Sequence, residues 1–294
     1  MSSRARGILG WSVAAALLAV VLHAGVAVAE DVDGTLKKIK SSGTLTLGYR
    51  ESSPPFSFAG PDKRPAGYSI DLCLQVAAAV QKALGLSELK LSWVPVTPET
   101  RIDAVKRGTV DIECGSTTAS LSRQEQVDFS LMTFVDGGGL LITKESNLRG
   151  IGDLAGKRVA VATGTTTERA LAEFLKGEFV TAQTVPVKDH AEGMAALQAG
   201  KVDAYASDRA ILVGLALTAP DPKRFALSAV AFSYEPYALM VRRNDATFRL
   251  LVNRALSDVY RSGRILSIYD RWFGVFGKPS VVLQAMYQLN ALPE

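Results

Sequence analysis

Apolar and polar residues along the chain switch repeatedly between the period of a strand and the period of a helix. Residues 44–50 alternate as a strand does, and Pro54 follows as a stop. Over 69–84 apolar side chains recur at helical spacing, with Ser69 placed as the N-cap and Gly85 as the end. The same pattern then predicts a strand over 89–96, a helix over 100–108 and a strand over 110–113.

The alternation of strands and helices restarts in the second half of the chain. The predicted strands cover 158–162, 179–185, 202–206 and 237–241, and the predicted helices cover 166–176, 189–199 with Asp189 as its cap, 246–261 and 264–273. Such alternation is typical of an α/β protein with mostly parallel sheets and helices on both faces.

Two stretches of the chain have similar sequences. Val105–Asp111 and Leu197–Asp203 each contain the end of a helix, a glycine and then Val-Asp at the start of a short strand. Polar residues follow each strand. An internal repeat of this kind indicates two similar α/β lobes that face one cleft.

The two lobes have predicted boundaries. A first part of lobe 1 covers 30–138, lobe 2 covers 139–236, and 237–294 returns to lobe 1, with no prediction for the tail over 278–294. The chain passes from lobe 1 to lobe 2 at a first crossing and returns at a second crossing. Gly137-Gly138-Gly139 at the first crossing provides the backbone freedom of a hinge. The predicted fold is therefore two-lobed, with a hinge of two strands.

Residues 1–29 have the order of a secretory signal peptide. Arg4 and Arg6 precede an apolar run over 8–22, and the small residues before Glu30 predict cleavage after Ala29. The alternative is an uncleaved anchor, although the apolar run is shorter than the roughly 20 residues of a membrane span. We therefore expect an exported, periplasmic protein.

Charge and cysteine content narrow the class of protein only slightly. The formal net charge of the whole chain is +4, and two of the basic residues, Arg4 and Arg6, lie in the predicted signal. The remainder is nearly neutral and gives no argument for nucleic acid. Cys73 and Cys114 form a disulfide or remain buried thiols, and both alternatives stay open because spacing alone does not fix the distance between them.

Candidate binding residues lie where the predicted strands end, which is where open α/β sheets bind ligands. Arg50 ends a strand, and Arg101 stands at a helix start, where a positive charge is unfavourable. Gly164–Thr167 opens a helix, a position that suits a carboxylate or simply an N-cap. Asp208 either receives an ammonium group or caps the next helix.

Several kinds of catalytic or cofactor site have no matching motif. The chain contains no Gly-x-Ser-x-Gly, no Cys-x-x-Cys, no His-Glu-x-x-His and no Gly-x-Gly-x-x-Gly, and His190 is the one histidine after the predicted signal. We therefore expect no metal and no cofactor.

The residues at these strand ends carry a family resemblance. Arg50–Ser53, Gly67–Asp71, Asp111–Thr118, Gly164–Thr166 and Ser207-Asp208, together with Arg123-Gln124 and Lys188–His190, resemble the glutamate/aspartate-binding proteins of ABC transporters, in family 3 of the extracellular solute-binding proteins. The similarity runs from about Thr35 to Phe273. It implies a clamp that closes on a free amino acid and delivers it to a permease and its ATPase.

The resemblance also implies a role for each binding residue. Arg123, Thr118 and Thr166 would hold the α-carboxylate, Ser116 and Asp208 the ammonium group, and Arg50, Arg101 and His190 the side-chain carboxylate. Ser52 and Thr165 complete the predicted ligand-binding set. Pro98 stands where related proteins have a serine that helps to hold the distal carboxylate, so the choice among glutamate, aspartate and their amides stays open.

Electrostatics points to the same ligand class. A neutral amino acid needs one cation and one carboxylate, whereas Arg50 and Arg101 add two cations that an acidic side chain would neutralise. We expect a monomer with no nucleic-acid partner. The alternatives are an enzyme on the same scaffold, such as a cyclohexadienyl or arogenate dehydratase, and a sensory module that signals to a receptor.

Overall fold

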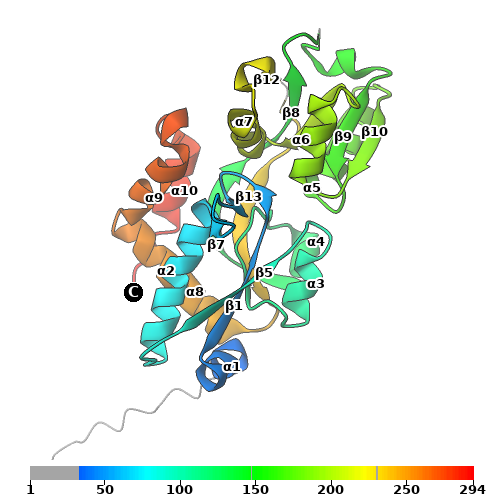
Figure 1. Cartoon of the computed structure of the whole chain (residues 1–294). Helices are drawn as coiled ribbons and strands as arrows, with labels where there is room; N and C mark the ends of the chain where they lie inside the picture. Colours follow the sequence, from blue (N-terminus) through cyan, green and yellow to red (C-terminus); the bar gives the residue numbers. More distant parts are fainter. Residues whose placement is uncertain (1–32, 147, 230) are drawn as a thin grey trace, which may run out of the picture. The chain divides into compact units, whose positions relative to one another are not determined.

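The computed structural model describes residues 33–294 except 147 and 230. The predicted signal peptide and its cleavage site lie outside the described residues. Two five-stranded sheets form the framework, and a small three-stranded sheet accompanies the first (Figure 1). No helix among the described residues is long and apolar enough to cross a membrane.

The first sheet has the strand order β5-β1-β6-β13-β7, and we call it with its helices lobe 1. Its strands are β1 (Thr44–Tyr49), β5 (Lys90–Pro95), β6 (Ile112–Glu113), β7 (Val127–Asp136) and β13 (Glu235–Arg242). Its helices are α1 (Gly34–Ser42), α2 (Tyr68–Ala83), α3 (Arg101–Lys106), α4 (Leu121–Gln124), α8 (Ala246–Arg261), α9 (Arg264–Phe273) and α10 (Val281–Leu289). Helices α2 and α8 lie on one side of this sheet and α3 and α4 on the other (Figure 1).

The second sheet has the order β10-β9-β11-β8-β12, and we call it with its helices lobe 2. Its strands are β8 (Gly138–Thr143), β9 (Arg158–Ala162), β10 (Gln183–Val187), β11 (Ala204–Asp208) and β12 (Phe225–Leu227), and its helices are α5 (Thr166–Gly177), α6 (His190–Gln198) and α7 (Arg209–Thr218). The chain enters this sheet at β8 and returns to the first sheet at β13.

The two sheets share one plan of pairing. In each, three neighbouring strands are parallel, as the sequence predicts, and two further pairings are antiparallel. Strands β8 and β13, which begin at the two crossings, supply antiparallel neighbours. The carboxyl ends of β1, β5 and β6 in lobe 1 and of β9, β10 and β11 in lobe 2 lead to the candidate residues.

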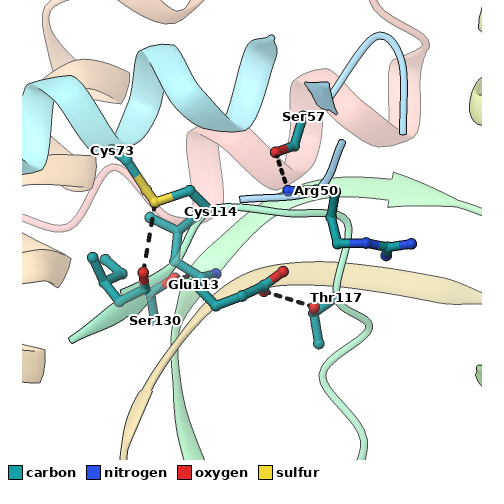
Figure 2. Close-up of a disulfide and its surroundings, with 9 residues drawn as sticks. Arg50, Ser57, Cys73, Glu113, Cys114, Thr117 and Ser130 are labelled. Carbon is teal, nitrogen blue, oxygen red and sulfur yellow. Dashed lines mark hydrogen bonds between the residues drawn. A yellow bond between two sulfur atoms is a disulfide. The ribbon is translucent and has the colours of Figure 1, made fainter. Parts of the chain in front are cut away.

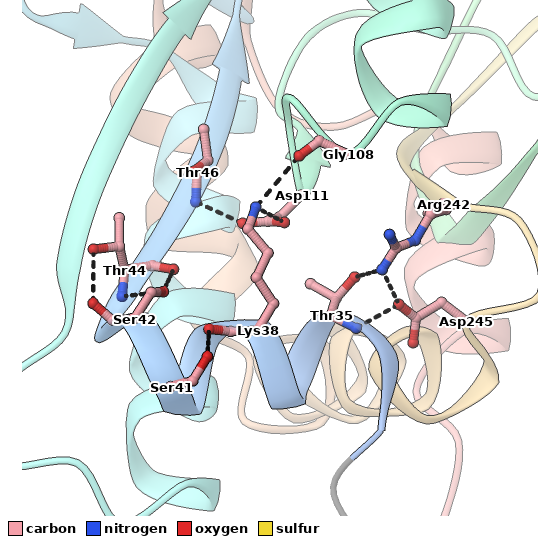
Figure 3. Close-up of polar contacts among 10 residues, drawn as sticks. All are labelled: Thr35, Lys38, Ser41, Ser42, Thr44, Thr46, Gly108, Asp111, Arg242 and Asp245. Carbon is pink, nitrogen blue, oxygen red and sulfur yellow. Dashed lines mark hydrogen bonds and ion pairs between the residues drawn. The ribbon is translucent and has the colours of Figure 1, made fainter.

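The internal repeat has a structural role in both lobes. Asp111 accepts hydrogen bonds from the backbone N–H of Thr46 (2.9 Å) and from Lys38 Nζ (2.7 Å) (Figure 3). Asp203 accepts equivalent bonds from the backbone N–H and the guanidinium of Arg158. The repeated aspartate thus joins the strand that it precedes to its parallel neighbour, at the edge away from the candidate residues.

Several local predictions differ from the structure. Helix α2 begins at Tyr68, so Gly67 and not Ser69 is the N-cap residue, with a φ of 133°. Strand β10 begins at Gln183, four residues later than predicted, because Phe179 adopts a left-handed φ of 57° and is 95% exposed. The sequence did not predict the short strands β2 (Ser52–Ser53), β3 (Ser57–Ala59) and β4 (Pro65–Ala66).

The C-terminal tail packs on lobe 1. Helix α10 buries Leu283, Met286 and Tyr287, and the Tyr287 hydroxyl is 2.9 Å from that of Tyr68. Tyr68 belongs to a buried aromatic cluster in which Phe134 and Phe273 stack with their centroids 4.9 Å apart. The tail therefore covers the core of lobe 1 near the end of β7.

Candidate functional site

One pocket collects most of the predicted ligand-binding residues. Its lining consists of Arg50, Arg101, Ser116, Thr118, Thr165, Thr166, Thr167, His190, Ser207 and Asp208. Eight of these belong to the predicted set, whereas Thr167 and Ser207 do not. Both lobes contribute. The first four residues follow strands or begin a helix of lobe 1, and the others either lie at the start of α5 and α6 or end β11 of lobe 2.

Two predicted residues do not line this pocket. Arg123 lies in α4 beside it, where Nη1 donates to Thr118 O (2.9 Å) and Nη2 donates to Gly164 O of lobe 2 (3.3 Å). Ser52 pairs with Phe58 in the small sheet and is absent from the lining. The structure therefore places Arg123 at the boundary between the lobes and leaves Ser52 without a place in the pocket.

Three arginine side chains are buried together, with only 2–5% of each exposed. Burial, followed by repulsion from Arg101, lowers the pKa of Arg50 to about 10 and that of Arg123 to about 9. Both remain cationic at neutral pH. Arg50 Nη2 and Arg101 Nε have no hydrogen-bond partner among the described residues, so each has an N–H available for another acceptor.

Two buried glutamates share this region, and the sequence prediction of uncompensated cations is therefore wrong. Glu113 Oε2 accepts from Thr117 Oγ1 (2.7 Å), which in turn accepts from Arg101 Nη1 (2.7 Å). Glu235 is 1% exposed and adds a second carboxylate. With Asp208, three carboxylates face three guanidinium groups. Glu113 lies within the predicted strand over 110–113 as a charged residue in an apolar pattern, whereas Glu235 precedes the predicted strand over 237–241 and had no such signal.

Asp208 is buried at the end of β11 and does not cap α7 through its side chain. It accepts hydrogen bonds from Thr167 Oγ1 (2.7 Å) and from the Tyr237 hydroxyl. Burial and then the nearby charge of Glu235 raise the pKa of Asp208 to about 6. A cation placed beside Asp208 would favour its ionised form.

His190 is buried and neutral at pH 7. Its Nδ1 lies 2.6 Å from the Tyr205 hydroxyl and 3.4 Å from Ser207 Oγ. Burial, followed by the charges of Arg50 and Arg101, holds the pKa of His190 well below its usual value. The imidazole therefore acts as a neutral hydrogen-bonding group.

Neighbouring threonines at the start of α5 have different roles. Thr165 is the N-cap, since its side chain accepts from the Glu168 N–H and donates to Ala162 O (2.7 Å). The Thr166 hydroxyl instead points to lobe 1, where it lies 3.2 Å from Thr118 Oγ1. Of these two hydroxyls, only that of Thr166 makes a contact between the lobes.

A disulfide supports the loop that carries Ser116 and Thr118. Cys73 of α2 and Cys114, which follows β6, are bonded, with their Cα atoms 6.1 Å apart (Figure 2). This bond resolves the alternative that the sequence left open. No group of three or more potential metal ligands occurs within the part of the chain that the structure describes.

Comparison with known proteins identifies the class to which this fold and pocket belong. Residues 45–275 match the family described as bacterial extracellular solute-binding proteins, family 3. The chain therefore belongs to this family, whose solved relatives have the type II periplasmic-binding-protein fold.

Two curated relatives are similar over most of their length. One is named L-glutamate/L-aspartate-binding protein, from Pseudomonas aeruginosa, and is 44% identical over 88% of this chain and 85% of its own. Another, from Salmonella typhimurium, is named glutamate/aspartate import solute-binding protein and is 36% identical over 88% of this chain and 87% of its own.

A solved structure of similar fold is an ancestral amino acid-binding protein described as a precursor of cyclohexadienyl dehydratase. It has a TM-score of 0.71 and 29% identity, over 82% of this chain and all of the other. The same scaffold is thus linked to both binding and catalysis.

Proposed function

We propose that this chain binds an acidic amino acid, L-glutamate or L-aspartate, between its lobes and delivers it to an ABC-type permease and its ATPase. The observation that carries the proposal is the gathering of three buried arginines and Asp208 where the two lobes meet. An acidic amino acid has two carboxylates and one ammonium group, which match these partners. The names of the two curated relatives support the same ligand class.

The proposed roles follow the placement of each side chain. Arg123, Thr118 and Thr166 meet at the start of α5 and would hold the α-carboxylate. Asp208 and Ser116 would hold the ammonium group, while Arg50, Arg101 and His190 would hold the distal carboxylate. Because Arg50 and Arg101 each retain an unbonded N–H, the proposal rests on available donors and not on an excess of positive charge.

An enzyme on this scaffold is the second candidate, favoured by the structural relative described as an enzyme precursor. Such an enzyme needs a general acid near the leaving group. His190 is neutral, Glu113 is hydrogen-bonded to Thr117, and Glu51 is exposed. We therefore propose binding without turnover, and incubation with prephenate or arogenate should leave both compounds unchanged.

The decisive experiment is calorimetry with purified protein against a panel of amino acids. L-glutamate and L-aspartate should bind, and L-glutamine more weakly. Arg101→Ala should weaken the two acidic ligands by about a hundredfold, the effect of about 3 kcal/mol for a lost charged hydrogen bond, and should affect glutamine less.

Arg107→Ala is the matched control, because Arg107 follows α3 on the exposed side and pairs with Asp103. It should leave every affinity unchanged. Tight binding of a neutral solute with no response to acidic ones, or intact glutamate binding by Arg101→Ala, would refute the ligand assignment.

We further infer that residues 1–29 direct export to the periplasm with cleavage after Ala29. For the mature protein we keep the predicted lobes of 30–138 with 237–294 and of 139–236, except that β8 begins one residue and β13 two residues before these bounds. We expect a monomer, since the proposed site is built from one chain.

A further inference from the structure

Glu235 is a buried carboxylate that the proposed binding roles do not use. It begins β13 at the second crossing, directly opposite Asp136 of β7. Its Oε1 accepts from Ser233 Oγ (2.6 Å), and that hydroxyl accepts from the backbone N–H of Gly138 (2.8 Å). Glu235 is therefore held by both crossing segments.

The other oxygen of Glu235 contacts both lobes. Oε2 accepts from Thr118 Oγ1 of lobe 1 (2.5 Å) and from Thr166 Oγ1 of lobe 2 (2.6 Å). Attraction between Glu235 and the nearby Arg123 also favours the charged form of that guanidinium. The place where these donors meet, at the N-terminus of the twelve-residue helix α5, thus already holds a carboxylate.

The same hydroxyls cannot serve two carboxylates at once. Each threonine hydroxyl has a single hydrogen to donate, and in this structure Glu235 accepts from both Thr118 and Thr166. A ligand carboxylate that approached these donors and Arg123 would also be repelled by the charge of Glu235. It would have to take the two hydroxyls away from Glu235.

We propose that Glu235 is an internal competitor for the ligand α-carboxylate: it ties Thr118 of lobe 1 to Thr166 of lobe 2 until the ligand takes over these hydroxyls. This inference rests on the proposed function and adds a positioning residue to it. Part of the ligand's binding free energy is then spent on displacing an existing contact between the lobes, which lowers the apparent affinity.

Glu235→Gln tests the competition, since the amide keeps the shape of the side chain and removes its charge. L-glutamate affinity, measured by calorimetry, should rise about tenfold, because a charged acceptor no longer competes. Isoglutamine, whose α-carboxylate is an amide, should show no such gain. Lower or unchanged glutamate affinity in a variant that melts cooperatively would overturn the proposal.

Glu113→Gln is the matched control, because it removes another buried carboxylate of the same cluster that contacts Thr117 instead. An equal gain in Glu113→Gln would assign the effect to net charge and would overturn competition at the threonines. If Glu235→Gln does not fold, Ser233→Ala loosens the hold on Oε1 and should give a smaller gain in the same direction, and no gain would refute the idea.

A measurement without ligand separates this inference from the ligand assignment. Small-angle scattering of the ligand-free protein should give a larger radius of gyration for Glu235→Gln than for the wild type and Glu113→Gln. Equal radii would count against the tie between the lobes. Failure of the wild type to bind acidic amino acids would refute the proposed function, and the scattering comparison would still test the tie.

Discussion

Individual residues of this protein combine charge with burial, and Asp208 is the clearest case. Its carboxylate is enclosed by Thr167 and Tyr237 and is influenced by Glu235. Ionising a buried carboxyl group costs free energy, and a cationic group of a bound ligand can offset this cost. This environment suits the role of ammonium partner that we propose for Asp208.

The affinity for L-glutamate should therefore fall in acid. The ligand ammonium group needs ionised Asp208, and the pKa of this carboxyl is about 6 because burial raises it. Binding then requires release of a proton from Asp208, so the dissociation constant should rise about fivefold from pH 6 to pH 5, and about tenfold in total from pH 7 to pH 5. His190, whose pKa is held well below its usual value, adds no charge change in this window.

Calorimetry between pH 5 and 7.5 provides the measurement. Asp136 is the relevant control, because burial and then Asp208 raise its pKa to about 7 and it titrates nearby. Asp136→Asn should preserve the pH dependence. A constant affinity over this range would show that Asp208 is not the ammonium partner.

At the residue scale, the sequence predicted which positive and hydroxyl side chains converge, because parallel strands bring their carboxyl ends to one edge. It treated Glu113 as a candidate general acid near the site and not as a partner of the arginines, and it did not predict Glu235 as a member of the cluster. The direction of a side chain in a two-residue strand such as β6, or at the first residue of β13, is decided by pairing partners far along the chain. The charge balance of the site was therefore beyond the reach of pattern alone.

At the scale of elements, long amphipathic helices were the easiest to predict. Helices α8 and α9 have the bounds that the hydrophobic period gives. The start of α2 was missed because it depends on a turn: a Cβ on Gly67 would lie 2.2 Å from Phe56 O, so only glycine fits there. Ser69, the predicted N-cap, is a residue type that often caps helices, but it lies inside the first turn of α2.

Gly67→Ala should destabilise the protein strongly. The left-handed φ and the clash with the Phe56 carbonyl act together, and we expect a loss of about 3 kcal/mol or more in the free energy of unfolding. Gly85→Ala is the control, with a φ of 62° but no atom within 4 Å of the added Cβ, and should cost about 1 kcal/mol. Equal urea midpoints for the two variants would contradict the role of the carbonyl contact.

At the scale of the whole molecule, the repeated helix-glycine-Val-Asp segment predicted two related sheets, and the structure has them. The repeat succeeded as a guide to topology because Asp111 and Asp203 fix equivalent strand pairs. The tail helix α10 had no counterpart in the repeat. It is defined by contacts with the aromatic cluster of lobe 1, which depend on the complete fold.

The bond between Cys73 and Cys114 should contribute to the stability of the whole chain. It closes a loop of 41 residues, for which the chain-entropy relation gives about 4 kcal/mol. Urea unfolding of the ligand-free Cys73→Ala/Cys114→Ala protein should show a loss of that order. The wild type unfolded with a reductant should approach the same midpoint, and an unchanged midpoint in the double variant would contradict the estimate.

This cross-link also decides how the protein must be made for study. Recombinant material that accumulates in a reducing cytosol would keep both thiols, leaving the segment with Ser116 and Thr118 without its covalent support from α2. Titrations on such preparations would describe a less constrained molecule than the disulfide-bonded protein. Thiol quantification on each batch is therefore the first requirement for any comparison of affinities.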